Sequence, residues 1–147
     1  MSVIRLFGPP VAALMTTMGL AAGAAERPSA EYVDAMKTLA VVAQEMPKRL
    51  AADDADGMEQ LVYDARPALA VLEQYWTARA VDEAVELAQA ASKAIAEISV
   101  AVHLMEDGPN PLATEGAEQS LKNLAATCVS CHAAYRETLP DGSYAIK

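Results

Sequence analysis

Three side chains near the C-terminal end of the chain can do chemistry together: Cys128, Cys131 and His132. They form the pattern Cys-x-x-Cys-His, which is typical of covalent haem attachment. On a helix, residues three apart lie about one turn from each other, so both thiols can reach the two vinyl groups of one porphyrin. The imidazole that follows can then bind the iron as its proximal ligand. The pattern therefore predicts one covalently attached haem c.

Other chemistries use two cysteines at this spacing. A disulfide between them would close a very short loop and remove little entropy from the unfolded chain. A thiol-disulfide exchange site needs a helix N-terminus beside a βαβ pattern, which this sequence lacks. A zinc site needs a fourth ligand, for which His103 is the only obvious nitrogen. Two buried cysteines without a ligand are the remaining alternative.

Four segments that could position these residues carry apolar side chains at gaps of three and four, and none alternates at period two over a useful length. This pattern predicts an all-α domain, an antiparallel four-helix bundle with the haem motif on the last helix. The expected helices span about residues 29–50, 54–76, 81–104 and 114–138.

Capping and breaking residues set the expected helix ends. Ser29 and Thr114 are the expected N-caps of the first and last helices. Pro47 and Pro67 fall inside the first and second helices, where they predict a kink, a break or an early end, because proline removes a backbone donor. The segment 107–111, Asp-Gly-Pro-Asn-Pro, predicts a turn before the last helix.

Each helix has one apolar stripe that we expect to face the core. Both cysteines lie on the stripe of the last helix, so they should point into the bundle. The first and last stripes are Tyr32, Met36, Leu39, Ala43, Met46 and Leu50, and Ala117, Leu121, Leu124, Cys128, Cys131 and Tyr135. The second and third are Met58, Val62, Ala65, Leu69, Leu72 and Trp76, and Val81, Val85, Ala88, Ala91, Ile95, Ile98 and Val102.

The first two dozen residues have the composition of an export leader. Arg5 gives a positive start, residues 11–20 are apolar and uncharged, and small residues precede a cleavage point at Ala24. We expect residues 1–24 to be a signal peptide and residues 25–147 to be the haem domain, located in the periplasm without a membrane anchor. A retained anchor is the alternative, but glycines and prolines interrupt the apolar run.

The chain is acidic, with 20 Asp and Glu against 11 Lys and Arg and a formal charge of −9. Nucleic acid and anionic membranes are therefore not expected partners. The acidity favours solubility and also suits a basic docking partner. Outside the haem motif we find no nucleophile with an adjacent base and no phosphate-binding glycine loop, so an enzyme is the least favoured class.

The run from Thr127 to Arg136, TCVSCHAAYR, resembles the class II cytochromes c, the family of cytochrome c′ and its low-spin relatives. In that family the haem motif lies on the last helix of a four-helix bundle. The resemblance implies thioether bonds at Cys128 and Cys131, His132 as the proximal ligand, and Arg136 near the haem.

The resemblance also implies a residue on the first helix over the distal face of the haem. That position matches Met36 of this chain, and in low-spin members of the family a methionine there binds the iron. The family often has an arginine one turn earlier, where this chain has Tyr32. Methionine and histidine ligands imply a one-electron carrier that serves redox partner proteins. An unbound Met36 implies instead a five-coordinate protein that binds nitric oxide or carbon monoxide.

Association with other chains remains open at this point in two forms. The haem could be largely structural in a subunit of a larger redox complex. Bundles of this family often dimerise through their first two helices, so a homodimer is a further expectation of the resemblance.

Overall fold

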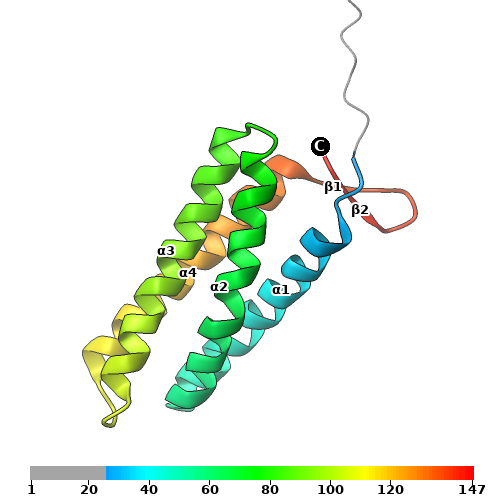
Figure 1. The fold of residues 1–147 in the computed structure, drawn as a ribbon. Helices are drawn as coiled ribbons and strands as arrows, with labels where there is room; N and C mark the ends of the chain where they lie inside the picture. Colours follow the sequence, from blue (N-terminus) through cyan, green and yellow to red (C-terminus); the bar gives the residue numbers. More distant parts are fainter. Residues whose placement is uncertain (1–25) are drawn as a thin grey trace, which may run out of the picture.

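The computed structural model describes residues 26–147, so the expected signal peptide of residues 1–24 lies outside the described residues. Within them the elements are α1 (Ala30–Ala51), α2 (Ala55–Thr77), α3 (Asp82–Met105), α4 (Pro111–Tyr135), β1 (Arg136–Thr138) and β2 (Tyr144–Ile146). The predicted all-α four-helix bundle is confirmed. The chain reverses direction at each short connection between helices (Figure 1). No helix in this part of the chain is both long and apolar enough to cross a membrane.

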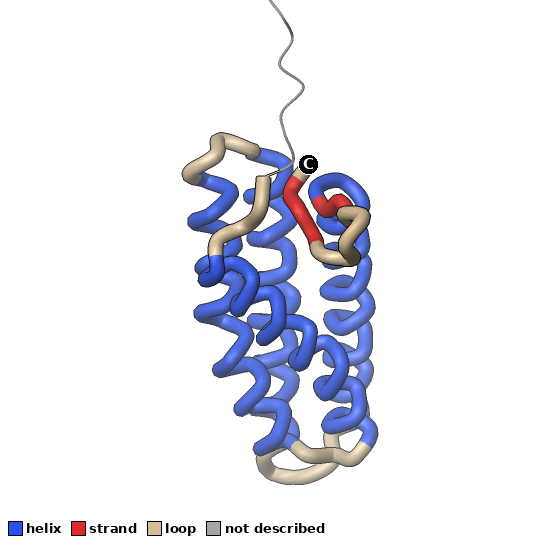
Figure 2. The backbone as a smooth tube through the Cα atoms, turned by 90° about the vertical axis from the view of Figure 1, so that its right-hand side faces the viewer, coloured by secondary structure: helices blue, strands red, loops and turns tan. Residues whose placement is uncertain are grey.

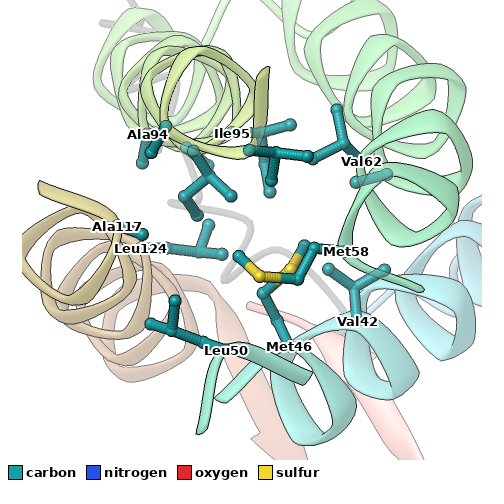
Figure 3. Packing of buried hydrophobic residues seen from close by; sticks show 14 of the residues in the cluster. Val42, Met46, Leu50, Met58, Val62, Ala94, Ile95, Ala117 and Leu124 are labelled. Carbon is teal, nitrogen blue, oxygen red and sulfur yellow. The ribbon is translucent and has the colours of Figure 1, made fainter. Parts of the chain in front are cut away.

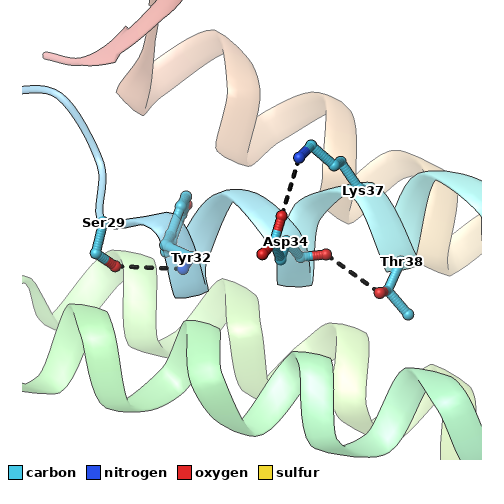
Figure 4. Close-up of polar contacts among 5 residues, drawn as sticks. All are labelled: Ser29, Tyr32, Asp34, Lys37 and Thr38. Atoms are coloured by element: carbon cyan, nitrogen blue, oxygen red, sulfur yellow. Dashed lines mark hydrogen bonds and ion pairs between the residues drawn. The ribbon is translucent and has the colours of Figure 1, made fainter.

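Polar side chains start three of the described helices. The Ser29 hydroxyl accepts a hydrogen bond from the Tyr32 N–H at 3.2 Å, as predicted, at the start of α1 (Figure 4). The Asp54 carboxylate accepts one from the Gly57 N–H at 2.9 Å at the start of α2. A side chain at Gly57 would collide with this carboxylate, so the glycine permits the cap.

The last helix differs from its predicted span of residues 114–138 at both ends. It begins at Pro111, because Asn110 caps it by accepting from the Ala113 N–H at 3.2 Å and proline suits the first helical position. Thr114 is therefore not the cap; its hydroxyl donates to the Asn110 carbonyl at 3.0 Å. The helix ends at Tyr135, because the next three residues pair with β2.

The break and the early end predicted at the prolines do not occur. Helix α1 continues past Pro47 to Ala51, and α2 runs without a break through Pro67. Both prolines lie on exposed positions, where water can bond the carbonyl group that each leaves without a donor.

The core has two parts. The larger one fills the half of the bundle away from the chain ends, and its largest fully buried side chains are Val42, Met46, Met58, Ile95 and Ile98. Figure 3 labels several side chains of this part of the core. The smaller one lies toward the chain ends and is rich in aromatic rings, contributed by Tyr32, Tyr75 and Trp76 with the half-buried Tyr135. All six predicted stripe residues of α2 are buried.

The chain ends meet at one end of the bundle. Strands β1 and β2 form an antiparallel hairpin in which Arg136 pairs with Ile146 (Figure 2). Glu26 forms a bridge to the other side of Ile146, with hydrogen bonds of 3.0 and 2.8 Å in the two directions. The sequence pattern predicts only a short tail here, so this hairpin is an addition to the predicted fold.

Candidate functional site

The two cysteines lie on α4, half-buried and free of any disulfide. Burial raises the pKa of the Cys128 thiol, and burial together with the neighbouring Cys128 raises the pKa of the Cys131 thiol. Burial, followed by the Arg136 guanidinium, lowers the pKa of the half-buried His132. His132 is therefore held in its neutral form, which is the form that binds a metal ion.

Two cavities meet at these residues. The inner cavity, of about 50 Å³, is walled by apolar side chains from all four helices and includes Cys128 on its lining. The outer cavity, of about 360 Å³, lies between α1, the end of α4 and the hairpin, and has Arg136 on its lining. Met36, Cys131 and His132 line both cavities. The fold therefore brings Met36 of α1 beside the chemistry-bearing end of α4.

The predicted apolar stripes are incompletely covered where they face these cavities. On α1, Met36 and Leu39 are only half-buried and Ala43 is exposed, and all three line the inner cavity. The stripe residues Met46 and Leu50, further along the same helix, are buried in the core. Apolar groups that face a void lose the dispersion contacts that a packed neighbour provides, so α1 is less well packed at Met36, Leu39 and Ala43 than at Met46 and Leu50.

The same contrast occurs along α4. Its stripe residues Ala117 and Leu124 are buried against neighbouring helices, whereas Cys128 and Cys131 are only half-buried. The seam between α1 and α4 is also the loosest of the four helix–helix seams. Helix α1 is inclined to the other helices, as both views of the bundle show (Figures 1 and 2).

Arg136 lies outside the helix on which it was predicted. It is the first residue of β1, and its guanidinium carbon is 3.3 Å from the centroid of the Tyr144 ring. The chain leaves the helical path after Tyr135 because β1 pairs with β2. Arg136 nevertheless lines the outer cavity together with His132, so it remains beside the predicted site.

The hairpin supplies cavity walls that sequence reasoning missed. Tyr144, Ala145 and Ile146 line the outer cavity, and Ala145 is 1% exposed. A signal was present, because Asp141-Gly142 is a strong hairpin dipeptide, and Gly142 has a φ of 80° that favours glycine.

The geometry does not support the alternative of a zinc site that includes His103. His103 lies near the end of α3, its side chain is 79% exposed, and its Nδ1 is 3.1 Å from a Glu106 carboxylate oxygen. Within residues 26–147, no group of three or more His, Cys, Asp or Glu side chains is placed to hold a metal ion.

The residues around the cavities fit the haem that the motif implies. Two free thiols and a neutral imidazole lie along one side of apolar cavities, and a thioether lies on α1 at the same cavities. The outer cavity has the volume of a small-molecule site.

Comparisons with protein-family models, with curated proteins and with solved structures give no match for this chain. The interpretation of the site therefore depends on its own geometry and chemistry.

Proposed function

We propose that this protein is a periplasmic monohaem c-type cytochrome, similar to the class II cytochromes c, that carries single electrons between redox partner proteins. Cys128 and Cys131 hold the haem c, His132 is the proximal ligand and Met36 is the distal ligand. The observation that supports this proposal most directly is the shared lining of two apolar cavities by Met36, Cys131 and His132.

Each residue has a separate role in this proposal. A bound haem supplies a one-electron couple at its iron. The two cysteines fix the cofactor on α4, and the neutral His132 offers a lone pair at one face. Met36 offers a thioether from α1, and the cavity walls around it are largely apolar. If Met36 and His132 both bind the iron, the same two residues would hold it in both oxidation states, which favours electron transfer.

Gas binding is a second candidate. Met36 is only half-buried where it borders both cavities, so its thioether could pack near the iron without binding it and leave the sixth position to a diatomic molecule. The spin state of the purified protein separates the two candidates, because a bound methionine gives a low-spin spectrum and an open sixth position gives a high-spin one.

The central test is expression of the whole chain with a haem-attachment pathway. We expect a red protein whose mass exceeds that of residues 25–147 by one haem, and whose colour survives acid-acetone extraction. The same mass identifies the processing point near Ala24. A folded but colourless product would refute the proposal.

Cysteine variants locate the attachment. Either Cys128→Ser or Cys131→Ser should reduce covalent haem, and the double variant should abolish it. Ser130→Ala is the matched control, because Ser130 lies between the cysteines but is exposed and lines neither cavity. It should retain full haem content.

A further inference from the structure

Arg136 places a positive charge beside the candidate site. Its backbone N–H donates a hydrogen bond to the His132 carbonyl, and both residues line the outer cavity. Arginine keeps its charge over the whole pH range in which proteins work. The end of α4 therefore carries a permanent cation next to the residue that we propose as the proximal ligand.

The hairpin fixes the position of this cation. Strands β1 and β2 pair so that Arg136 lies opposite Ile146 and Thr138 lies opposite Tyr144. Arg136 and Tyr144 are thus diagonal neighbours on one face of the hairpin, a separation that long side chains can span. The Arg136 guanidinium carbon is 3.3 Å from the centroid of the Tyr144 ring, which is a cation–π contact. The tyrosine ring therefore holds the guanidinium at the outer cavity.

No carboxylate neutralises this cation. Among residues 26–147 Arg136 forms no ion pair, and no Asp or Glu side chain lines the outer cavity. The other cation on this lining, Lys37, is paired with Asp34 at 2.9 Å, and both side chains are 72% exposed. Arg136 is half-buried, so salt and water screen its charge less. Of the two cations, Arg136 exerts the stronger net field on the cavity.

A fixed positive charge beside a redox centre favours the reduced state. Coulomb attraction stabilises the form that carries the additional electron, and the stabilisation is larger where little water lies between the charges. A guanidinium that moved freely into solvent would exert a weaker field. The contact with Tyr144 is therefore needed for the charge to have its full effect.

We propose that Arg136 raises the reduction potential of the bound haem and that Tyr144 is the positioning residue that keeps Arg136 beside the cofactor. This inference depends on the proposed function, since it requires a haem attached to α4. It gives the hairpin a role in setting the potential, in addition to its role as a wall of the outer cavity.

The test is the midpoint potential of the haem-loaded protein and its variants, measured by spectroelectrochemistry. Arg136→Gln should lower the potential, because the charge is lost. Tyr144→Leu should lower it by a smaller amount, because the charge remains but loses its fixed place, and Tyr144→Phe should leave it unchanged, because the ring remains. An unchanged potential in Arg136→Gln would overturn the inference, and an unchanged one in Tyr144→Leu would overturn the role of Tyr144.

Two further variants separate charge from packing. Arg136→Lys keeps the charge, so a potential as low as that of Arg136→Gln would overturn the inference. The double variant Asp34→Asn with Lys37→Gln removes a neutral pair at the same cavity and is the matched control. It should leave the potential nearly unchanged, and a fall equal to that of Arg136→Gln would overturn the specific role of Arg136.

The outcomes of these measurements are distinct from failure of the proposed function. The mass of each variant shows whether covalent haem is present, and circular dichroism shows whether the bundle is folded. A potential that does not respond in a folded, haem-loaded variant overturns this inference and leaves the proposed function standing. If Arg136→Gln does not fold, the comparison of Tyr144→Leu with Tyr144→Phe decides the question.

Discussion

Met36 and Met46 lie on the same helix but in different surroundings. Met46 is fully enclosed in the larger core, whereas Met36 is half-buried and borders both cavities. Their separation of ten residues is about 15 Å along a helix, so only one of them can lie over a given iron. Surroundings therefore distinguish a candidate ligand from a core side chain of the same type.

Replacement of Met36 by Ala should convert a low-spin protein to a high-spin one that takes up carbon monoxide. The reason is that the substitution removes the thioether and leaves the His132 side of the cofactor unchanged. Optical spectra in both oxidation states measure the change. An unmutated protein that is already high-spin would reject ligation by Met36 and favour gas binding.

Met46→Ala is the matched control at the residue scale. It should lower the free energy of unfolding by about 2–5 kcal/mol, because it leaves a void in a packed core. The haem spectrum of the folded protein should remain unchanged, because Met46 lines neither cavity. Urea unfolding followed by circular dichroism, with spectra taken before denaturant is added, separates the two effects.

At the scale of elements, the start of α4 depends on Asn110. Its side-chain oxygen bonds the Ala113 N–H, one of the backbone donors that the helix itself leaves free. Asn110→Ala should therefore destabilise the protein by about 1 kcal/mol. Thr114→Ala should lower the free energy of unfolding by less, because the Thr114 hydroxyl only donates to a carbonyl. Equal losses from the two variants in urea unfolding would contradict this assignment of the cap.

The start of α2 should make stability depend on pH. The Gly57 N–H and then the Arg49 guanidinium, whose Nη1 is 2.6 Å from an Asp54 oxygen, hold the pKa of Asp54 below its ordinary value. A lowered folded-state pKa contributes stability above about pH 4, and this contribution is lost as the pH falls through the lower folded-state pKa. Asp54→Asn keeps the cap acceptor without the charge. The stability difference between the two proteins should shrink as the pH is lowered from neutral to about 3.

Helix α2 was the easiest element to predict from sequence. Its stripe from Met58 to Trp76 is buried in full, although Leu69, Leu72 and Trp76 also border the inner cavity. Periodicity shows which face of a helix turns inward, but it does not show whether protein or a guest covers that face. For this reason the orientation of Cys128 and Cys131 could be predicted, whereas the two cavities could not.

The ends of α4 were harder to predict for a different reason. Asn110 and Thr114 are both plausible caps, and local sequence does not decide between them. The departure from helix after Tyr135 depends on pairing with β2, and the bridge from Glu26 to Ile146 joins the two ends of the described chain. Such long-range pairing leaves no trace in a local pattern of apolar residues.

For the molecule as a whole, the cofactor should stabilise the two halves unequally. The double variant Cys128→Ser with Cys131→Ser lacks a covalent guest, and the loose seam between α1 and α4 is the one that the guest would fill. We expect hydrogen exchange to accelerate first in the part of α1 around Met36 and in the hairpin. The far half of the bundle, packed around Met46 and Ile98, should stay protected longer.

Far-ultraviolet circular dichroism of this apo-protein should show less helix than the haem-loaded protein. Ser130→Ala, which keeps both thioethers, serves as the control with full helicity. Uniform loss of protection over all four helices would contradict the prediction that the two halves of the bundle differ in stability. It would indicate that the bundle unfolds as one cooperative unit.

The bridge between Glu26 and Ile146 also constrains the order of events during biogenesis. If the chain is exported with its amino end leading, as the proposed function requires, Glu26 emerges well before Ile146. The bridge, and with it this part of the outer wall, can then form only after the chain has emerged as far as Ile146. Cys128 and Cys131 would stay open to an attachment enzyme until that point, and the wall would close over a porphyrin already in place.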